Sequence, residues 1–264
     1  MSARVIVTGA YGKMGREVLK AVHNDPDLIL VAAVDVKSGD DVGEVIGIGK
    51  LGITIQDDLE KAIAESKATV LIDFTRPETV MGNIRKAITG GVCPVAGTTG
   101  FSAADLEEIR DLCTKHNVGA LIAPNFAIGA ILMMKMAVEA AKYLPHVEII
   151  EFHHDQKLDA PSGTALRTAE LIKEVRSTLH QGHPDEFEKL TGARGGDYDG
   201  MRIHSVRLPG YVAHQEVIFG GLGQTLVIRH DSISRESFMP GVVLAAKKVH
   251  QLKGLVFGLE NLLD

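Results

Sequence analysis

Several features are scarce in this 264-residue sequence, and each scarcity excludes a class of protein. Two cysteines, Cys93 and Cys113, are too few for the disulfide framework of a small secreted domain, so we expect a protein of the reducing cytoplasm. No apolar run reaches the roughly 18 residues of a membrane-spanning helix. The N-terminus shows no charged-then-apolar leader, and neither a signal peptide nor a membrane partner is expected.

Positive charge is also scarce. The 28 lysine and arginine residues are outnumbered by 34 acidic residues, which gives a formal net charge of −6. This balance provides no basic footprint for nucleic acid, so any anionic ligand must be held by local groups. The rest of the composition, 45% hydrophobic and 23% charged with 28 glycines, is typical of a globular α/β protein, and the length allows two domains.

The first half of the chain alternates between two patterns. Short runs that are apolar throughout are typical of parallel strands covered on both faces, and they lie at residues 4–8, 28–34, 69–73, 94–97 and 120–123. Helical patterns lie between them, at residues 15–23, 57–65, 77–89 and 105–116. Ser102, followed three residues later by Asp105, resembles a capping box for the last of these helices. The alternation predicts a Rossmann-type α/β domain with a parallel sheet.

After residue 125 the pattern changes. A helix at residues 130–143, a strand at 147–154 and a helix from 163 to about 177 precede three strand candidates within residues 203–232. Residues 180–200 predict a long mobile loop, and residues 238–263 are expected to be helical and to return to the first domain. We therefore predict a dinucleotide-binding domain of residues 1–125 plus 238–264, and a second, α+β domain of residues 126–237 that carries a mixed sheet.

Three glycines follow the first strand in 5-VIVTGAYGKMGREVL-19. A turn through Gly9, Gly12 and Gly15 lets backbone N–H groups approach a pyrophosphate with no Cβ in the way, and the next helix adds its N-terminal dipole. The G-x-x-G-x-x-G spacing alone also fits an ordinary glycine-rich turn. Asp35, which ends the second strand, stands where a carboxylate meets the adenosine ribose hydroxyls. The two features together predict a nicotinamide dinucleotide site.

The choice between NADH and NADPH depends on fewer residues. Asp35 favours a free ribose 2′-hydroxyl, whereas Lys13 and Lys37 could bind a 2′-phosphate or be plain surface charges. We expect both cofactors to be accepted.

Three more loops, 73-DFTRP-77, 97-GTTGF-101 and 123-APNF-126, follow strands of the same sheet. Each could be a simple turn, but beside a dinucleotide site we expect contacts with the nicotinamide half.

The densest polar cluster is 151-EFHHDQKLDAPSGTA-165. A metal site fits it poorly, because adjacent His153 and His154 on a strand point to opposite faces and neither cysteine is near, so no metal is expected. A nucleophilic Ser162 lacks the G-x-S-x-G elbow and stands where a helix N-cap is expected. A merely solvated loop is a further alternative.

Proton transfer accounts for more of this cluster. The turn at Asp159 leads into a helix that begins after Ser162, and the free N–H groups of a helix start suit a carboxylate. A histidine and a lysine beside such an anion pocket can supply a proton to an intermediate created by hydride transfer. This interpretation implies a small acidic substrate and a reduced cofactor.

The run E-F-H-H-D-Q-K-L-D-A-P-S-G-T-A also resembles the signature of the dihydrodipicolinate reductases, or 4-hydroxy-tetrahydrodipicolinate reductases, of lysine and diaminopimelate biosynthesis. The resemblance extends over the whole chain, through the glycine loop, 73-DFTRP, 97-GTTG, 192-GARGG, 203-IHSVRLPG, 213-AHQEVIFG and 229-RHDS. It implies that His153 donates or accepts a proton, that Lys157 donates one, and that His154, Gly163 and Thr164 bind the substrate.

The cofactor contacts expected from the resemblance and from the strand-end loops are Gly9, Ala10, Tyr11, Gly12, Lys13, Met14, Asp35, Phe74, Thr75, Gly97, Thr98, Thr99, Ala123, Pro124, Asn125 and Phe126. The sequence departs from the family pattern at Val36, where some members carry an arginine, and this departure argues against a strong NADPH preference.

The resemblance further implies an NAD(P)H-dependent reductase of a cyclic imine dicarboxylate. It also implies a homotetramer formed through the sheets of the second domains, which would then bind substrate and mediate oligomerisation. Two alternatives stay open from the residues alone. One is another two-domain Rossmann oxidoreductase, for amino acids or sugars, and the other is a non-catalytic sensor of the dinucleotide.

Overall fold

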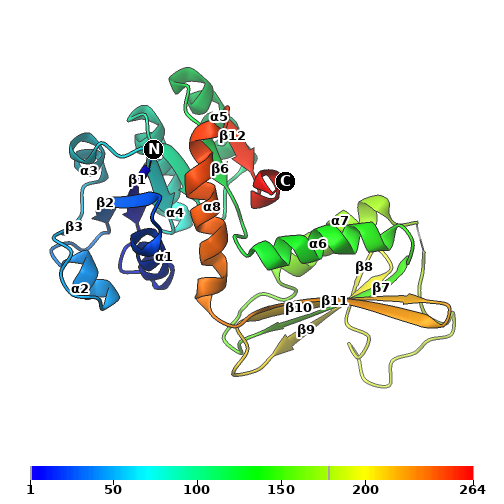
Figure 1. The fold of residues 1–264 in the computed structure, drawn as a ribbon. Helices are drawn as coiled ribbons and strands as arrows, with labels where there is room; N and C mark the ends of the chain where they lie inside the picture. Colours follow the sequence, from blue (N-terminus) through cyan, green and yellow to red (C-terminus); the bar gives the residue numbers. More distant parts are fainter. Residues whose placement is uncertain (1, 178, 264) are drawn as a thin grey trace. The chain divides into compact units, whose positions relative to one another are not determined.

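The computed structural model describes residues 2–177 and 179–263. It divides into two compact units (Figure 1). Unit 1 comprises the chain up to Ile128 together with the segment from Phe238 on, and unit 2 comprises Gly129–Ser237. The chain thus leaves unit 1 three residues after the expected boundary at 125 and returns to it at residue 238.

Unit 1 is built on a parallel sheet. Within the described residues its strands lie in the order β12-β6-β5-β4-β1-β2-β3, and every hydrogen-bonded pair is parallel. Their bounds are β1 Ala3–Thr8, β2 Leu28–Val34, β3 Ile55–Gln56, β4 Val70–Asp73, β5 Cys93–Ala96, β6 Ala120–Ile122 and β12 Leu255–Phe257. Consecutive residues of β1 (Val5, Ile6 and Val7) are fully buried. Because neighbouring strand residues point to opposite faces, both faces are covered, which confirms the Rossmann-type prediction.

The helices of unit 1 are α1 Lys13–Asn24, α2 Val42–Ile46, α3 Leu59–Ser66, α4 Pro77–Thr89, α5 Ala103–His116 and α8 Met239–Lys248. Helices α3, α4 and α5 contribute to two apolar clusters against the sheet. Helix α4 joins both clusters, since Ile88 packs with Ile109 of α5, whereas Ala87 packs with Leu71 of β4. The predicted capping box of α5 is confirmed, because the Ser102 hydroxyl accepts the Asp105 N–H at 3.1 Å.

The C-terminal stretch differs from the expected run of helix. A 3₁₀ turn at Val249–Gln251 ends the helical part begun by α8, and β12 then pairs with β6. The helical expectation is therefore wrong at β12, whereas Leu259–Leu262 form a further 3₁₀ turn. Gly254 and Gly258 both have positive φ, and they bound three apolar residues that extend along the edge of β6. Burial along a sheet edge decides this segment, and periodicity does not reveal it.

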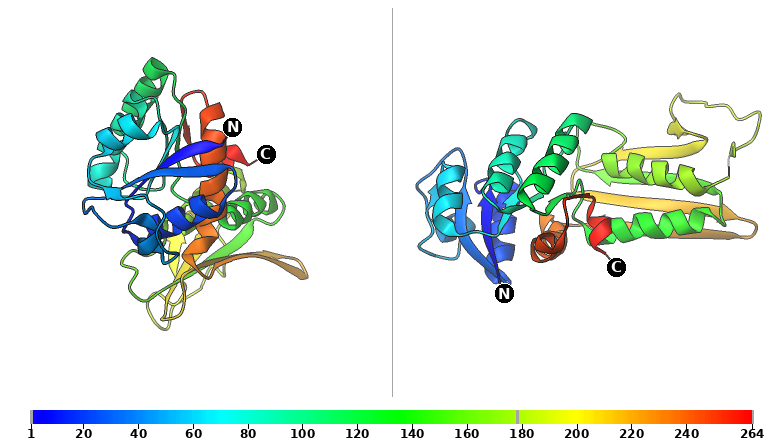
Figure 2. Two further views of the ribbon diagram at one scale, coloured as in Figure 1. Left: turned by 60° about the vertical axis from the view of Figure 1, so that its left-hand side comes forward. Right: turned by 90° about the horizontal axis from the view of Figure 1, so that it is seen from above.

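Unit 2 contains a mixed sheet covered by two helices. Its strand order is β11-β10-β7-β9-β8, with β7 and β9 parallel and the other pairs antiparallel. The strands are β7 His146–His153, β8 Gly196–Tyr198, β9 Met201–Arg207, β10 Ala213–Gly221 and β11 Gln224–Ser232. Helices α6 Ile128–Ala141 and α7 Gly163–Val175 both lie on one face of the sheet (Figure 1 and Figure 2). The predicted α+β architecture with a mixed sheet is confirmed.

The segment 180–200 is more structured than the expected loop. Its end forms β8, which pairs with β9. Before β8 the Glu188 carboxylate accepts the backbone N–H groups of Gly192 and Arg194, each at 2.8 Å. This strand could have been predicted, because Asp199 and Gly200 both have positive φ and form the two-residue turn to β9 that an Asp-Gly pair favours.

Strand β7 positions the polar cluster. Its residues alternate in burial, so that Val147, Ile149 and Glu151 are buried while Glu148 and Ile150 are partly exposed. Because side chains alternate between the two faces of a strand, Glu151 and His153 share the buried face with Val147 and Ile149. A carboxylate and an imidazole are thus placed on the side of the sheet that the rest of the core uses.

Candidate active site

The glycine loop of unit 1 needs glycine most at two positions. Gly9 has φ +78°, and a Cβ there would lie 2.6 Å from the carbonyl oxygen of Phe74. A Cβ on Gly15 would lie 1.9 Å from the carbonyl oxygen of Gly9, whereas one on Gly12 would lie 3.1 Å from that oxygen. Gly12 caps α1, so the N-terminus of that helix faces the turn and can receive an anion.

Asp35 lies beside this loop, as the sequence predicts. Its carboxylate accepts the backbone N–H of Tyr11 at 2.9 Å and that of Val36 at 2.8 Å. Gly9, Asp35 and Val36 line one pocket together with Thr75, one of the expected contacts of the next loop. The structure therefore brings the glycine loop, the carboxylate and the loop after β4 to one place.

The two lysines considered for a 2′-phosphate are placed differently. Lys37 Nζ lies 5.5 Å from the centre of the Tyr11 ring, whose hydroxyl donates to Asp40 at 2.8 Å. Lys13, at the start of α1, is exposed. A third lysine, Lys86 of α4, lines the Asp35 pocket and was missed by sequence reasoning, because its position depends on how α4 packs.

A buried carboxylate organises the strand ends. Asp73, the last residue of β4, is 0% exposed. Its Oδ1 accepts hydrogen bonds from the backbone and hydroxyl of Thr75, at 3.0 and 2.7 Å, and from the Thr98 hydroxyl at 3.1 Å. Its Oδ2 accepts from the Thr8 hydroxyl at 2.7 Å and the Asn83 amide at 2.8 Å. One carboxylate thus joins the ends of β1, β4 and β5 to helix α4.

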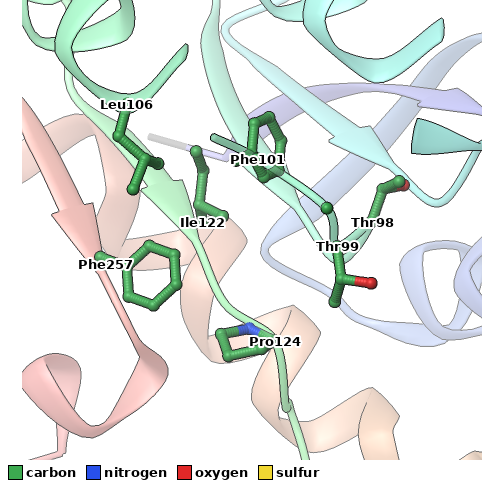
Figure 3. Close-up of a pocket in the computed structure, with 8 residues that line it drawn as sticks. Thr98, Thr99, Phe101, Leu106, Ile122, Pro124 and Phe257 are labelled. Carbon is green, nitrogen blue, oxygen red and sulfur yellow. The ribbon is translucent and has the colours of Figure 1, made fainter. Parts of the chain in front are cut away.

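A second pocket of unit 1 opens at the carboxyl ends of β5, β6 and β12 (Figure 3). Thr98, Thr99 and Pro124, three of the expected cofactor residues, line it together with Gly100, Phe101, Leu106, Ile122 and Phe257. Phe257 was missed, because the strand that carries it was expected to be helical. The structure therefore gathers the 97–101 and 123–126 loops at one edge, where ligands of parallel sheets bind.

Some expected cofactor residues point away from solvent. Ala10, Ala123 and Phe126 are buried, so their side chains belong to the core of unit 1 and only their backbone can meet a ligand. The Phe126 ring lies 5.6 Å from that of Phe74, and Phe74 in turn covers Gly97, where a Cβ would lie 2.1 Å from the ring. These residues support the loops through packing.

In unit 2 a buried ion pair holds the end of β7. Glu151 is 0% exposed and accepts hydrogen bonds from His153 Nδ1, from both terminal nitrogens of Arg207 at 2.7 and 2.8 Å, and from the Ser162 N–H at 3.2 Å. Burial raises the pKa of Glu151, but hydrogen bonds from His153, Arg207 and Ser205 outweigh it and hold that pKa at about 2. The carboxylate is therefore ionised at neutral pH.

The remaining predicted residues surround the start of α7. Ser162 is its N-cap, as predicted, since its hydroxyl accepts the Ala165 N–H at 3.2 Å. Among the described residues, neither the Gly163 nor the Thr164 N–H finds an acceptor, so both can hold an anion. Lys157 Nζ donates to Asp159 at 2.7 Å, and this hydrogen bond lowers the pKa of Asp159 below its ordinary value.

The two adjacent histidines differ in environment. His153, the last residue of β7, contacts Glu151, whereas His154 lies just beyond the strand that was expected to include it and is exposed. In the described ranges no group of three or more His, Cys, Asp or Glu residues could hold a metal ion. Across the same residues no helix is long and apolar enough to cross a membrane.

Sequence reasoning missed Glu151 and Arg207 as site residues. Glu151 could have been found, because it lies on the same buried face of β7 as Val147 and Ile149. A buried acid needs a hydrogen-bonding partner. Arg207 could not, since the parallel register that sets it opposite His153 is a tertiary feature.

A Rossmann-type unit with this glycine loop and strand-end carboxylate, joined to a unit with proton-bearing groups, defines an oxidoreductase with a nicotinamide cofactor. Family models described as "Dihydrodipicolinate reductase, N-terminus" and "Dihydrodipicolinate reductase, C-terminus" match residues 3–126 and 129–263. The chain belongs to the dihydrodipicolinate reductase family, which confirms the resemblance seen in the sequence.

Individual relatives agree with this family. A protein of Desulfitobacterium hafniense (strain DSM 10664 / DCB-2) named 4-hydroxy-tetrahydrodipicolinate reductase is 60% identical over 263 residues, covering 99% of this chain and 98% of the relative. One of Syntrophomonas wolfei with the same name is 56% identical over 262 residues, with the same coverage.

Solved structures give the same result for the fold. A dipicolinate-bound dihydrodipicolinate reductase from Paenisporosarcina sp. TG-14 has a TM-score of 0.89 at 47% identity and covers 100% of both chains. An amine dehydrogenase from Mycobacterium smegmatis, with a TM-score of 0.69 at 14% identity over 98% of this chain and 96% of its own, shares the fold alone.

The Asp73 carboxylate predicts a sensitive position. In Asp73→Asn the amide NH₂ must face groups that now donate to an oxygen, so we expect a loss of about 1–3 kcal/mol in the free energy of unfolding. NADH binding should weaken by about tenfold as the strand-end loops separate. Denaturant unfolding and calorimetric titration measure the two effects. Asp111→Asn, on the exposed face of α5, is the control, and equal behaviour of both variants would contradict this role.

Proposed function

We propose that this protein reduces 4-hydroxy-tetrahydrodipicolinate to tetrahydrodipicolinate in lysine and diaminopimelate biosynthesis, with NADH or NADPH as the reductant. The observation that carries the proposal is the set of contacts at the start of α7. Glu151 accepts hydrogen bonds from His153 and the Ser162 N–H, and Asp159, the partner of Lys157, is held by Arg207. The names of the relatives and the dipicolinate bound to the Paenisporosarcina enzyme support a pyridine-type dicarboxylate as the ligand.

The reaction needs one hydride and one proton. Loss of the 4-hydroxyl as water would leave a conjugated cyclic imine, and a reduced nicotinamide held by the glycine loop and Asp35 would supply the hydride. Lys157 or His153 then protonates the carbon next to the one that accepts the hydride. Lys157 is held by Asp159 and His153 by Glu151, so each group has a fixed orientation.

The substrate carboxylates find complementary groups in unit 2. The N–H groups of Gly163 and Thr164 suit one carboxylate, because the N-terminus of α7 carries partial positive charge. His154 is exposed just beyond the end of β7, and we propose that it contacts the same ligand. These assignments follow the roles that family resemblance gives to the three residues.

In unit 1 we propose that the glycine loop from Gly9 to Met14 holds the pyrophosphate and that Asp35 binds the adenosine ribose. The pocket shared by Gly9, Asp35 and Thr75 supports this arrangement, and the pocket lined by Thr98, Thr99 and Pro124 would receive the nicotinamide end. Lys37 and Lys86 leave cations near the ribose, which supports use of NADPH as well as NADH.

We further propose a cytoplasmic homotetramer, as the family resemblance implies. The edge strand β11 supports association through the sheet of unit 2, because Leu226 and Val227 are 41% and 52% exposed there. Light scattering would give four times the 28.3 kDa of one chain if the proposal holds.

The function is tested by following oxidation of NADH and NADPH by the purified protein. We expect turnover with 4-hydroxy-tetrahydrodipicolinate and none without it. Turnover with amino acids or sugars in its place would favour another Rossmann oxidoreductase. Tight NADH binding without turnover on any of these compounds would favour a sensor.

The role of Asp35 predicts a difference between the cofactors. Asp35→Ala should weaken NADH binding more than NADPH binding, because only NADH presents a free 2′-hydroxyl to the carboxylate. Fluorescence titration with both cofactors measures the ratio. Asp40→Ala, which removes the acceptor of the Tyr11 hydroxyl and leaves Asp35 in place, is the control. An equal loss for both cofactors in Asp35→Ala would exclude ribose recognition by this residue.

The role of Lys157 predicts a loss in kcat. If Lys157 donates a proton in the transition state, Lys157→Ala should lower kcat by at least about 10²-fold with a smaller effect on KM. Lys157→Arg should not restore the rate, because a guanidinium donates its proton poorly at neutral pH.

Lys173→Ala is the matched control, since Lys173 also pairs with an aspartate, Asp199, but lies in the last turn of α7. A raised KM with kcat nearly kept, and arginine as a fair replacement, would show that Lys157 only binds a carboxylate.

A further inference from the structure

The buried carboxylate of unit 2 faces an unusual set of neighbours. Around Glu151 lie the His153 ring, the Ser162 N–H, the Arg207 guanidinium and the Ser205 hydroxyl, contributed by β7, the start of α7 and β9. A guanidinium and a backbone N–H can only donate, and an ionised carboxylate can only accept. The proton between Glu151 and His153 must therefore be on Nδ1 of the imidazole.

This assignment fixes the other ring nitrogen. With Nδ1 carrying its proton in both the neutral and the charged form of His153, Nε2 is the nitrogen left to exchange a proton with a ligand. A lone neutral imidazole would divide its proton between the two nitrogens. The carboxylate removes this choice, and it does so before any ligand binds.

Arg207 makes a charged carboxylate tolerable at this depth. An unpaired buried carboxylate would be neutralised, because desolvation disfavours its ionised form. The two N–H groups of the guanidinium meet the two oxygens of Glu151, and the second nitrogen also donates to the Asp159 carbonyl at 2.8 Å. Asp159 in turn holds Lys157, so one ion pair reaches both proton-bearing side chains of the site.

The same strand offers a comparison on its opposite face. Glu148 also pairs with an arginine and a histidine, Arg194 at 2.7 Å and His204 at 2.8 Å. Its side chain is 31% exposed, however, and His204 uses Nε2 for the contact. Chemically similar groups thus occur twice on β7, and only the buried set adjoins the start of α7.

We propose that Glu151, paired with Arg207, is a positioning residue that fixes the Nδ1–H tautomer of His153 and presents Nε2 to the substrate. The proposal rests on the proton-transfer role given to His153 under the proposed function. It adds a residue that touches neither substrate nor cofactor and acts through the imidazole.

Glu151→Gln tests the tautomer directly. The new NH₂ group must face either Arg207 Nη2 and the Ser162 N–H, which cannot accept, or Arg207 Nη1 and His153, which can accept by moving its proton. The second arrangement is less costly, so His153 should change from the Nδ1–H to the Nε2–H tautomer. The Ser205 hydroxyl also hydrogen-bonds to Glu151 and could accept as well, so the variant is compared with and without Ser205→Ala. Nitrogen-15 NMR of the ligand-free protein at a pH of about 9, where an ordinary histidine is neutral, reads the tautomer, with His153→Ala to assign the signal.

Kinetics give the second measurement. In Glu151→Gln kcat should fall by at least about 10²-fold while KM for the substrate changes by less than about threefold, because the lost interaction acts on proton transfer. Glu148→Gln, the matched control, should leave both values and the His153 signal unchanged. Arg207→Lys keeps the positive charge but loses the two-nitrogen contact of the guanidinium. Glu151 still accepts the hydrogen bond from His153, so His153 should keep its Nδ1–H tautomer. The kcat of this variant should fall by less than about tenfold.

The outcomes separate this inference from the proposed function. A His153 signal that stays in the Nδ1–H form in Glu151→Gln, or a kcat equal to that of Glu148→Gln, would overturn the positioning role. Equal losses in Glu151→Gln and Arg207→Lys with no change of tautomer would reduce the pair to a structural one and also overturn it. A tautomer change with full activity in His153→Ala would instead remove His153 from the reaction.

Discussion

A carboxylate that is fully removed from water must be surrounded by donors, and this requirement organises both units of the protein. In unit 1 Asp73 ends the strand β4 and collects donors from the ends of β1 and β5 and from α4. In unit 2 Glu151 lies near the end of β7 and collects them from β9 and α7. Each acid costs stability unless every one of these segments is in place, so each carboxylate makes the site and the fold depend on one another.

The sequence predicts the long elements of unit 1 well, because their signals are local. Helix α4 has the predicted bounds, the capping box of α5 is present, and the apolar strands lie where both faces of a sheet are buried. The strands β3, β8 and β12 were not predicted. Each has two or three residues and depends on a neighbouring strand for its hydrogen bonds. For β3 and β12 that strand is remote in sequence, whereas β8 pairs with β9 across a short turn.

The candidate site divides in the same way. Gly9, Asp35 and Ser162 could be recognised, since turn geometry, strand-end position and helix capping leave marks in the residues themselves. Phe257 and Arg207 could not, because strand pairing alone brings them to their pockets. The aromatic packing of Phe126 was also hidden: a residue in a strand-end loop was expected to contact the cofactor, yet its ring is in the core.

The alternation of β7 explains why so polar a segment folds at all. Glu148 lies on the outward face of the strand. Its ion pairs are partly exposed to solvent and contribute little to stability. Glu151 lies on the inward face, where its charge must be balanced completely by Arg207 and the start of α7. That balance requires β9, β7 and α7 to hold one arrangement, in which the Gly163 and Thr164 N–H groups find no acceptor among the described residues. The cost of burying one acid therefore orders the groups around the start of α7.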